Sequence, residues 1–520
     1  MSNDLLLAID QGTQSVRAML FDARGELVAR SQVHIEAYRS PEPGQAEQDC
    51  DYFWENLSLA CRNLWTEHPG LRERVVAAAL TTQRASVVCL DRELRPLRPA
   101  VIWLDQRRTR DYPSLPWWQD LPIRLVGQAE TLRGFRARAE CNWLASREPE
   151  IWARTRWFLL LSGYLTLRLT GHVRDAIAAQ VGYIPFDFRR HQWARPGDYK
   201  WSALRVRPEQ LPELVPAGSP LGTITAEAAS ATGIPEGLPL IAAGADKACE
   251  VLGSGALTPE TTSLSYGTTA TLNTCNRRHV EPLTFVPPYP AAVPGRYNSE
   301  VIVQRGYWMV NWFKREFAQA EVAEAERTGQ APEVLLERLL EESPPGAMGL
   351  VLQPFWNPGV RIPGPEAKGA IIGFGDVHTR AHLYRAILEG IAYALREGRD
   401  RMQRRNRTPI TRLMVSGGGS RSDGAMQITA DIFGMTAQRP HTFETSGLGA
   451  AINAAVGAGL HPDHATAIDA MTRPGDGFAP GREAAEIHDR LYRQVYARLY
   501  DRLSPLYRSI RHITGYPPRD

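Results

Sequence analysis

Two stretches of the chain, LLLAIDQGTQSVRAML at residues 5–20 and TSLSYGTTATL at residues 262–272, share one pattern. Each runs from an apolar strand through a Gly-Thr turn into a second strand, which predicts a β-hairpin. Backbone N–H groups beside a glycine can approach a phosphate closely, and a neighbouring threonine hydroxyl can donate to a phosphate oxygen. Two such turns facing each other across a cleft would hold a polyphosphate from both sides, so the pattern favours phosphoryl transfer.

Alternating strands and helices surround both hairpins. Apolar runs predict the strands, and helical periodicity with capping residues predicts the helices. In the first half we expect strands at 27–35, 75–80, 87–90, 100–103 and 238–244, and helices at 49–67 and 148–170. In the second half we expect a strand at 413–416 and helices at 307–319, 331–342, 378–404, 421–434, 446–459 and 481–508. The alternation predicts an α/β fold with two related halves.

Bulk properties exclude several classes of function. A chain of 520 residues normally forms more than one domain, and Gly253-Ser254-Gly255 marks the expected boundary between domains 1–253 and 254–520. The net charge of +3 is nearly balanced, which argues against a nucleic-acid or membrane partner. The six cysteines are scattered and form no CxxC pair, as expected in a reducing cytosol. Without a basic leader or an apolar run of ~18 residues, we expect a cytoplasmic protein.

The two Gly-Thr turns are the first candidate sites. Asp10 ends a strand, where its carboxylate can hold a metal ion through water, and Gly12 and Thr13 can bind a phosphate. Taken alone, this motif is explained equally well by an ordinary hairpin turn with an Asx cap. Gly267 and Thr268 offer the same groups in the second half. The pair is harder to explain by chance, because duplicated halves would place both turns at one cleft.

Two further strand ends carry candidate residues. Asp246 follows an apolar strand, where a carboxylate can accept a proton from an attacking hydroxyl, although on position alone a helix N-cap is the slightly favoured interpretation. The run Gly417-Gly418-Gly419 lies between a strand and a helix with Asp423, where a phosphate or a flat ring can lie against the backbone. Glycine-rich turns of this kind are common, and the GxGxxG spacing of a dinucleotide site is absent.

Gln83, Arg84, Trp103 and Asp105 follow neighbouring strands of the first half. Glutamine and arginine donate several hydrogen bonds to hydroxyl and carbonyl oxygens, and tryptophan offers a flat face to a sugar. A core tryptophan and an ion pair between Asp105 and a nearby arginine are the simpler interpretations of the single residues.

Taken in order, the motifs resemble the FGGY carbohydrate kinases, of the actin-like ATPase superfamily, over nearly the whole chain. The similar segments are DQGTQS at 10–15, GAD at 244–246, SYGT at 265–268, GAIIG at 369–373, HTRAHLYRAILEG at 378–390, SGGG at 416–419 and ETSGLGAA at 444–451. The resemblance implies an α/β fold of two duplicated actin-like (ribonuclease H-like) ATPase domains around a central cleft. It also overturns the simpler interpretations of Asp10, Thr13, Asp246 and Gly418.

The family implies ATP-dependent phosphorylation of a sugar or polyol hydroxyl, with Asp246 as general base and with Asp10 and Asp246 near Mg²⁺. The implied nucleotide-binding residues are Gly12, Thr13, Gln14, Ser15, Gly267, Thr268, Gly418, Gly419 and Asp423. The implied substrate-binding residues are Gln83, Arg84, Trp103 and Asp246. A small sugar or polyol is the expected partner, and a homodimer is one expected assembly because related kinases form dimers or tetramers.

The substrate is less defined, because the chain departs from the subgroup patterns. Gln83-Arg84 is similar to the glycerol-kinase subgroup, but Ala85 stands where that subgroup has Glu, and Thr271 stands where it has an aromatic residue. Both departures leave space for a longer substrate, which favours a pentulose such as xylulose or ribulose. The xylulokinase subgroup commonly has Met-His in place of Gln83-Arg84, and Glu140 stands where many relatives have Lys. Glycerol or another polyol as substrate, a non-catalytic actin-like sugar sensor, and an actin-like chaperone ATPase or filament protein are the alternatives.

Overall fold

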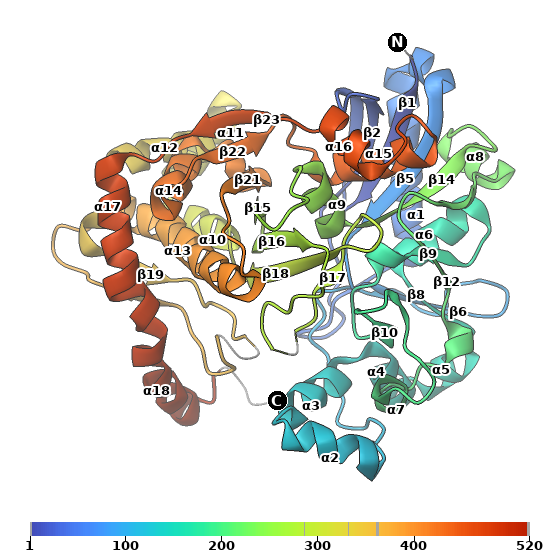
Figure 1. Ribbon diagram of the computed structural model, residues 1–520, viewed down its shortest axis with the longest axis horizontal. Helices are drawn as coiled ribbons and strands as arrows, with labels where there is room; N and C mark the ends of the chain where they lie inside the picture. The colour runs from blue at the N-terminus through green and yellow to red at the C-terminus, as the bar shows by residue number, and fades with distance from the viewer. Residues whose placement is uncertain (1–2, 285, 331, 360–362, 517–520) are drawn as a thin grey trace.

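The computed structural model describes residues 3–284, 286–330, 332–359 and 363–516. Figure 1 shows two lobes that each contain a β-sheet, with helix α9 (Asp246–Gly253) between them. The first half of the chain, in blue and green, forms the lobe on the right, and most of the second half forms the lobe on the left. This arrangement confirms the expected α/β class with two sheet-containing domains.

The first lobe is built on a six-stranded sheet with the strand order β13-β14-β5-β1-β2-β3. The strands are β1 (Leu5–Gln11), β2 (Ser15–Asp22), β3 (Leu27–His34), β5 (Val75–Thr82), β13 (Pro220–Thr223) and β14 (Pro239–Ala245). β1 pairs antiparallel with β2 and parallel with β5, which pairs parallel with β14. Every residue of β1 is buried, as expected for a central strand covered on both faces.

The second lobe repeats this arrangement in a seven-stranded sheet with the order β17-β18-β16-β15-β21-β22-β23. The strands are β15 (Thr261–Tyr266), β16 (Ala270–Asn276), β17 (Tyr289–Pro290), β18 (Tyr297–Val303), β21 (Arg412–Ser416), β22 (Ala437–Pro440) and β23 (Pro474–Phe478). β15 pairs antiparallel with β16 and parallel with β21, and β21 pairs parallel with β22. The order β3-β2-β1-β5-β14 therefore corresponds to β18-β16-β15-β21-β22, which confirms the expected duplication.

Helices from both halves of the chain cover the first sheet. α1 (Cys50–Glu67) begins where expected, because the Asp51 N–H donates to the Asp49 carboxylate at 2.9 Å. Together with α6 (Leu161–Thr170) and α8 (Ala226–Thr232), it shares one apolar core with this sheet. The other face packs against α9, α15 (Thr445–Gly457) and α16 (His464–Met471). Two helices that belong to the second half by sequence thus complete the core of the first lobe.

Glycines allow α9 and α15 to lie in direct contact. A Cβ atom added at Gly449 would overlap the carbonyl group of Cys249, and one added at Gly253 would overlap that of Thr445. Only a residue without a side chain permits this approach of one backbone to another. This close contact holds α9, which begins at Asp246, against α15 from the second half of the chain.

The helices of the second lobe surround one core with its sheet. They are α10 (Trp308–Phe317), α11 (Gln319–Thr328), α12 (Pro332–Glu341), α13 (Arg380–Asn406), α14 (Asp423–Phe433), α17 (Arg482–Leu491) and α18 (Ala497–Thr514). The helices expected near 307, 378, 421 and 446 are confirmed, and the helix expected at 331–342 is confirmed from Pro332, position 331 lying outside the described residues. The helix expected at 481–508 is confirmed as one helical stretch, in which a π-helical turn (Tyr492–Tyr496) joins α17 to α18.

A smaller region extends the first lobe with a four-stranded sheet of order β4-β7-β6-β8. Its strands are β4 (Glu47–Gln48), β6 (Val87–Leu90), β7 (Ala100–Val101) and β8 (Trp157–Leu160). The continuous helix expected at 148–170 is wrong, because α5 (Pro149–Arg154) and α6 flank β8, which pairs antiparallel with β6. A short apolar run fits a buried strand or a buried helix equally well, and only the pairing decides between them.

The remaining short elements connect these layers. They are α2 (Trp117–Leu125), α3 (Ala129–Arg138), α4 (Glu140–Arg147), α7 (Tyr199–Ala203), β9 (Arg174–Ala176), β10 (Phe186–Asp187), β11 (Gln192–Trp193), β12 (Glu213–Val215), β19 (Val351–Gln353), β20 (Ala370–Ile372) and 3₁₀ turns at Pro69–Arg74, Ile177–Ala179, Pro208–Gln210, Ala347–Gly349 and Gly418–Arg421. In the described part of the chain, no helix has the length and apolar character needed to cross a membrane.

Candidate active site

The turn between β1 and β2 is closed by its own backbone and by side chains from two other strand ends. The Gly12 N–H donates to the Ser15 carbonyl oxygen at 3.1 Å. The Thr13 hydroxyl donates to Gln83 Oε1 at 2.9 Å and accepts from Trp103 Nε1 at 3.0 Å. Gln83 and Trp103, predicted to bind substrate, therefore contact Thr13, predicted to bind nucleotide. The two predicted sites meet at this hydroxyl group.

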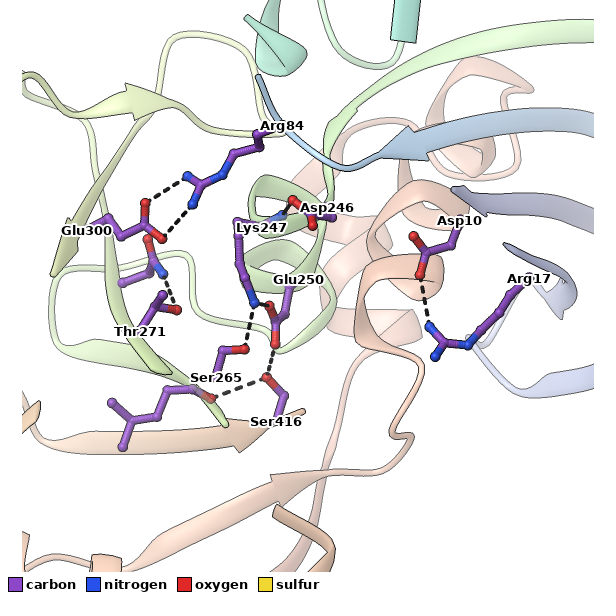
Figure 2. Close-up of polar contacts among 12 residues, drawn as sticks. Asp10, Arg17, Arg84, Asp246, Lys247, Glu250, Ser265, Thr271, Glu300 and Ser416 are labelled. Atoms are coloured by element: carbon purple, nitrogen blue, oxygen red, sulfur yellow. Dashed lines mark hydrogen bonds and ion pairs between the residues drawn. The ribbon is translucent and has the colours of Figure 1, made fainter. Parts of the chain in front are cut away.

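Asp10 lies buried at the end of β1, where Arg17 Nη1 donates to its Oδ2 at 3.3 Å (Figure 2). Burial raises the pKa of Asp10 to about 7 against the opposing charge of Arg17, and the carboxylate of Asp246 contributes to the increase. The two acids are thus close enough to repel each other. A cation between them would relieve this repulsion, and carboxylate oxygens are the ligands that Mg²⁺ prefers. Asp10 and Asp246 therefore fit the implied metal ion.

Asp246 is the first residue of α9, directly after β14. Ala245 is the N-cap of this helix, so the interpretation of Asp246 as an N-cap is wrong. One carboxylate oxygen, Oδ1, accepts the backbone N–H of Lys247 at 2.7 Å. Burial raises the pKa of Asp246, and the positive charges of Lys247 and Arg84 limit the increase. The residue thus combines a partly desolvated carboxylate with cations that favour its ionised form.

A buried polar network connects the helix of Asp246 to two strand ends of the second lobe (Figure 2). Lys247 Nζ donates to Glu250 Oε2 at 2.6 Å and to Ser265 Oγ at 2.7 Å. The Ser416 hydroxyl donates to Glu250 Oε1 at 2.7 Å. Ser265 lies two residues before Gly267, and Ser416 ends the strand that leads into the glycine run. The sequence prediction missed this network, whose only signal is the i, i+3 spacing of Lys247 and Glu250 beside Asp246.

The second Gly-Thr turn is held by the start of α10. The backbone N–H groups of Tyr307 and Trp308 donate to the carbonyl oxygens of Gly267 at 3.1 Å and Thr268 at 3.3 Å. The equivalent turns of the two lobes therefore have different supports: side chains hold the first, and a helix N-terminus holds the second. Because those bonds use carbonyl oxygens, they leave the N–H groups and the Thr268 hydroxyl of the turn for other partners.

The glycine run after β21 contains one crowded and one open position. A Cβ atom at Gly419 would overlap the ring of Tyr307, whereas a Cβ atom at Gly418 would meet no atom of the described residues within 4 Å. Gly418 therefore borders open space, as a position at a ligand site must. Asp423 follows on α14, where its carboxylate pairs with Arg439 Nη2 at 2.6 Å. Arg439 Nε also donates to a carbonyl of the same turn, so Asp423 supports the turn through Arg439.

Arg84 extends from the end of β5 to the second lobe. Its guanidinium group donates to both carboxylate oxygens of Glu300 on β18, at 2.7 and 3.2 Å (Figure 2). The ring of Tyr289 lies 5.3 Å from the guanidinium carbon. Sequence reasoning placed Arg84 in the substrate site but missed Glu300, because 216 residues separate the two. Asp105 pairs with Arg107 at 2.7 Å, which confirms the ion-pair interpretation of that residue.

Glu140, the unusual acid noted in the sequence, begins α4 in the outer part of the first lobe. Burial raises the pKa of its carboxyl group to about 8, and the charge of Asp105 contributes. Between the ordinary value of 4.5 and this value, the folded protein holds a proton that the unfolded chain has released. Stability therefore falls as the pH rises through this window.

Between pH 5 and pH 9 we expect the thermal midpoint to decline less in Glu140→Gln than in the wild type. The two declines should differ by roughly 2 °C or more. Differential scanning calorimetry across that range measures the difference. Glu130→Gln is the matched control, because the Glu130 side chain in neighbouring α3 is 82% exposed. Parallel curves for Glu140→Gln and the wild type would show that Glu140 is ionised in the folded protein.

The chain is similar to known proteins over nearly its whole length. A model of the FGGY family of carbohydrate kinases, N-terminal domain, matches residues 5–253, and the C-terminal domain model of the same family matches residues 262–458. The uncharacterized sugar kinase YgcE of Escherichia coli (strain K12) is 30% identical over 502 residues, which cover 96% of this chain and 94% of that protein. A xylulose kinase of Lactococcus lactis subsp. lactis (strain IL1403) is 27% identical over 504 residues, covering 96% and 97%.

The solved structures give the same result for the fold. The crystal structure of xylulose kinase from Rhodospirillum rubrum superposes with a TM-score of 0.79 at 26% sequence identity, covering 97% of this chain and 100% of that chain. Both lobes are therefore included in the likeness.

Proposed function

The chain belongs to the FGGY family of carbohydrate kinases, and from this premise we propose that it transfers the γ-phosphate of ATP to a hydroxyl group of a ketose or polyol, with a pentulose such as xylulose or ribulose favoured. As a member of this family it is a phosphotransferase with an alcohol group as acceptor. Its substrate and the roles of its individual residues are what we propose.

The position of Asp246 carries the proposal. Its carboxylate lies at the junction of the two lobes, beside Arg84 from the first lobe and a lysine that is bonded to the second. Few structural roles require an ionisable group there, because burying a carboxylate is costly unless it is paired. A general base is favoured by a raised pKa, and burial raises the pKa of Asp246, whose Oδ1 accepts the Lys247 N–H while Oδ2 would face the acceptor hydroxyl.

In the proposed reaction, Asp246 accepts the proton of the acceptor hydroxyl as that oxygen bonds to the γ-phosphorus. The bond between the γ-phosphorus and its bridging oxygen breaks, and ADP leaves with the electron pair. Asp10 and Asp246 would hold Mg²⁺, which when bound neutralises charge on the phosphates. The roles of the chain are to align the hydroxyl with the phosphorus and to exclude water from it.

The remaining predicted residues divide between nucleotide and sugar. Thr13 and Thr268 would hold the β- and γ-phosphates, supported by Gly12, Gln14, Ser15 and Gly267. Gly418 and Gly419 would line the adenine site, with Asp423 behind them. Gln83, Arg84 and Trp103 would contact the sugar. The hydrogen bonds from Trp103 to Thr13 and from Thr13 to Gln83 support this assignment, because they place the proposed sugar-binding residues next to a proposed phosphate-binding residue.

ADP release from Mg-ATP, measured with D-xylulose, L- and D-ribulose, glycerol, erythritol, gluconate and heptuloses, tests the proposal. We expect strong release with one pentulose, lowered by about 100-fold or more in Asp246→Asn. Release that does not depend on any acceptor would favour an actin-like ATPase of another kind. Binding of a sugar without release would favour a sensor.

Replacing Arg84 by alanine should raise KM for the sugar at least tenfold and change KM for ATP by less than twofold. The guanidinium group has five N–H donors, of which Glu300 uses two, so the others can reach acceptor hydroxyls. Steady-state kinetics with each substrate varied in turn measures both constants. Arg174→Ala is the control, because Arg174 forms a comparable ion pair with Glu213 on β12. Equal changes in both KM values would show that Arg84 does not bind the sugar.

A further inference from the structure

A small cavity lies next to Asp246 between the two lobes. From the first lobe it is lined by Arg84, Lys247 and the residue before Asp246. From the second lobe it is lined by Asn273, Tyr289 and Asn298, which come from three adjacent strands. About 10 Å³ of this cavity is open to a water-sized group, so an acceptor that offers a hydroxyl group to Asp246 would place one neighbouring polar group, rather than its whole chain, against these residues.

Both cations that line this cavity are already paired with buried carboxylates. Arg84 makes two hydrogen bonds to Glu300, which is 6% exposed, and Lys247 bonds at 2.6 Å to Glu250, which is 5% exposed. Asp246 adds a further carboxylate beside the same two cations. Acidic groups around the cavity thus outnumber basic ones, so the cavity holds no excess positive charge for an anionic ligand.

The second lobe presents amide groups to the same cavity. Asn298 is 4% exposed, and its Oδ1 has no hydrogen-bond partner among the described residues. Asn273, on the neighbouring strand, donates from Nδ2 to the Thr271 hydroxyl at 3.2 Å and stands opposite Glu300 in the sheet. A buried acceptor without a partner destabilises a protein, and a donor from a ligand removes that cost. A sugar hydroxyl is such a donor.

We propose that this cavity selects electrically neutral polyhydroxylated acceptors over sugar acids. In this proposal Glu300 determines specificity by neutralising Arg84, and Asn298 accepts a hydrogen bond from an acceptor hydroxyl. The inference rests on the proposed kinase function and adds the charge class of its substrate. Placing a sugar carboxylate here would bury another anion beside Asp246 while both nearby cations are already paired with Glu300 and Glu250, which is strongly unfavourable.

The test compares kcat/KM for D-xylulose and D-ribulose with that for the aldonates D-gluconate and D-xylonate. We expect the wild type to prefer a neutral ketose at least 100-fold. Glu300→Gln frees the charge of Arg84 while keeping the shape of the side chain, so we expect the aldonate-to-ketose ratio to rise at least tenfold. Glu213→Gln, which removes a carboxylate from the pair with Arg174 on the surface, should leave this ratio unchanged.

Asn298→Ala is a second variant that does not depend on the ion pair. Loss of the amide acceptor should raise KM for the ketose about tenfold with kcat changed by less than twofold, whereas a general loss of structure would lower kcat. If Glu300→Gln does not fold, an unchanged KM in Asn298→Ala overturns the proposal.

Other outcomes separate this inference from the kinase proposal. A wild type that prefers aldonates in an Asp246-dependent reaction, or a Glu300→Gln ratio within twofold of the wild type, would overturn the inference while leaving the kinase intact. If no acceptor supports ADP release, the charge selection is tested by measuring the binding of D-xylulose and D-gluconate to the wild type by calorimetry. Tighter binding of D-xylulose would support the charge selection without catalysis, and equal or absent binding of both would overturn it.

Discussion

Asp246→Asn is expected to lower kcat by about 10²–10⁴-fold while leaving ATP affinity nearly intact, the range typical of general-base catalysis. Asparagine has almost the same shape, and its amide oxygen can still accept the Lys247 N–H that now donates to Asp246 at 2.7 Å. What it loses is the ability to take a proton from the acceptor hydroxyl. Coupled ADP release at saturating pentulose measures kcat, and titration calorimetry with ATP measures the affinity.

Asp198→Asn is the matched control for this substitution. Asp198 also lies at the start of a helix, and it accepts the N–H of Lys200 at 2.9 Å, but that helix is in the outer part of the first lobe. We expect its turnover to equal that of the wild type. Near-wild-type turnover of Asp246→Asn itself would exclude the role of Asp246 as the base and, because asparagine is neutral, any essential role of its negative charge.

Gly449→Ala is expected to destabilise the protein by about 3 kcal/mol or more, at the upper end of the range for overpacked sites. The added methyl group would occupy the position of the Cys249 carbonyl group, which belongs to the backbone of α9 and cannot rotate away. Either α15 moves off the first sheet or α9 shifts together with Asp246. The expected observations are a thermal midpoint lower by roughly 5 °C or more and reduced turnover in the fraction that still folds.

Gly134→Ala separates this packing effect from the general effect of alanine in a helix. Gly134 lies inside α3, and a Cβ atom there would meet no described atom within 4 Å. Alanine has the higher helix propensity, so this variant should be unchanged or stabilised by up to about 1 kcal/mol. If Gly449→Ala behaves like Gly134→Ala, α9 and α15 are not held in the close contact described above.

Local patterns were enough to predict most of the secondary structure. Strand β1 is apolar at nearly every position, and the helix after Asp49 has both a cap and a clear periodicity, so each was predicted correctly. The segment at 157–160 was assigned to a helix, because an apolar run has no period that separates the two states. Its pairing with β6, about 70 residues away, made it a strand.

The same distinction applies to the candidate site. Asp10, Thr13, Asp246 and Gly418 stand in motifs that are contiguous in the sequence, and each was named from the sequence. Glu300 has no motif around it. Its importance comes from a contact with Arg84 across the two lobes, and such a contact depends on how the lobes pack.

The sequence alone therefore determined the α/β class, the duplication and the residues at the Gly-Thr turns, because these depend on neighbours within a few positions. Tertiary structure alone decided the contact of α15 with the first sheet, the network from Lys247 to Ser416, and the neutralisation of Arg84 by Glu300. Each of these joins residues far apart in the chain. Their contacts are selected by the burial of apolar surface and by the cost of leaving buried charges unpaired, and both are properties of the packed molecule rather than of any short segment.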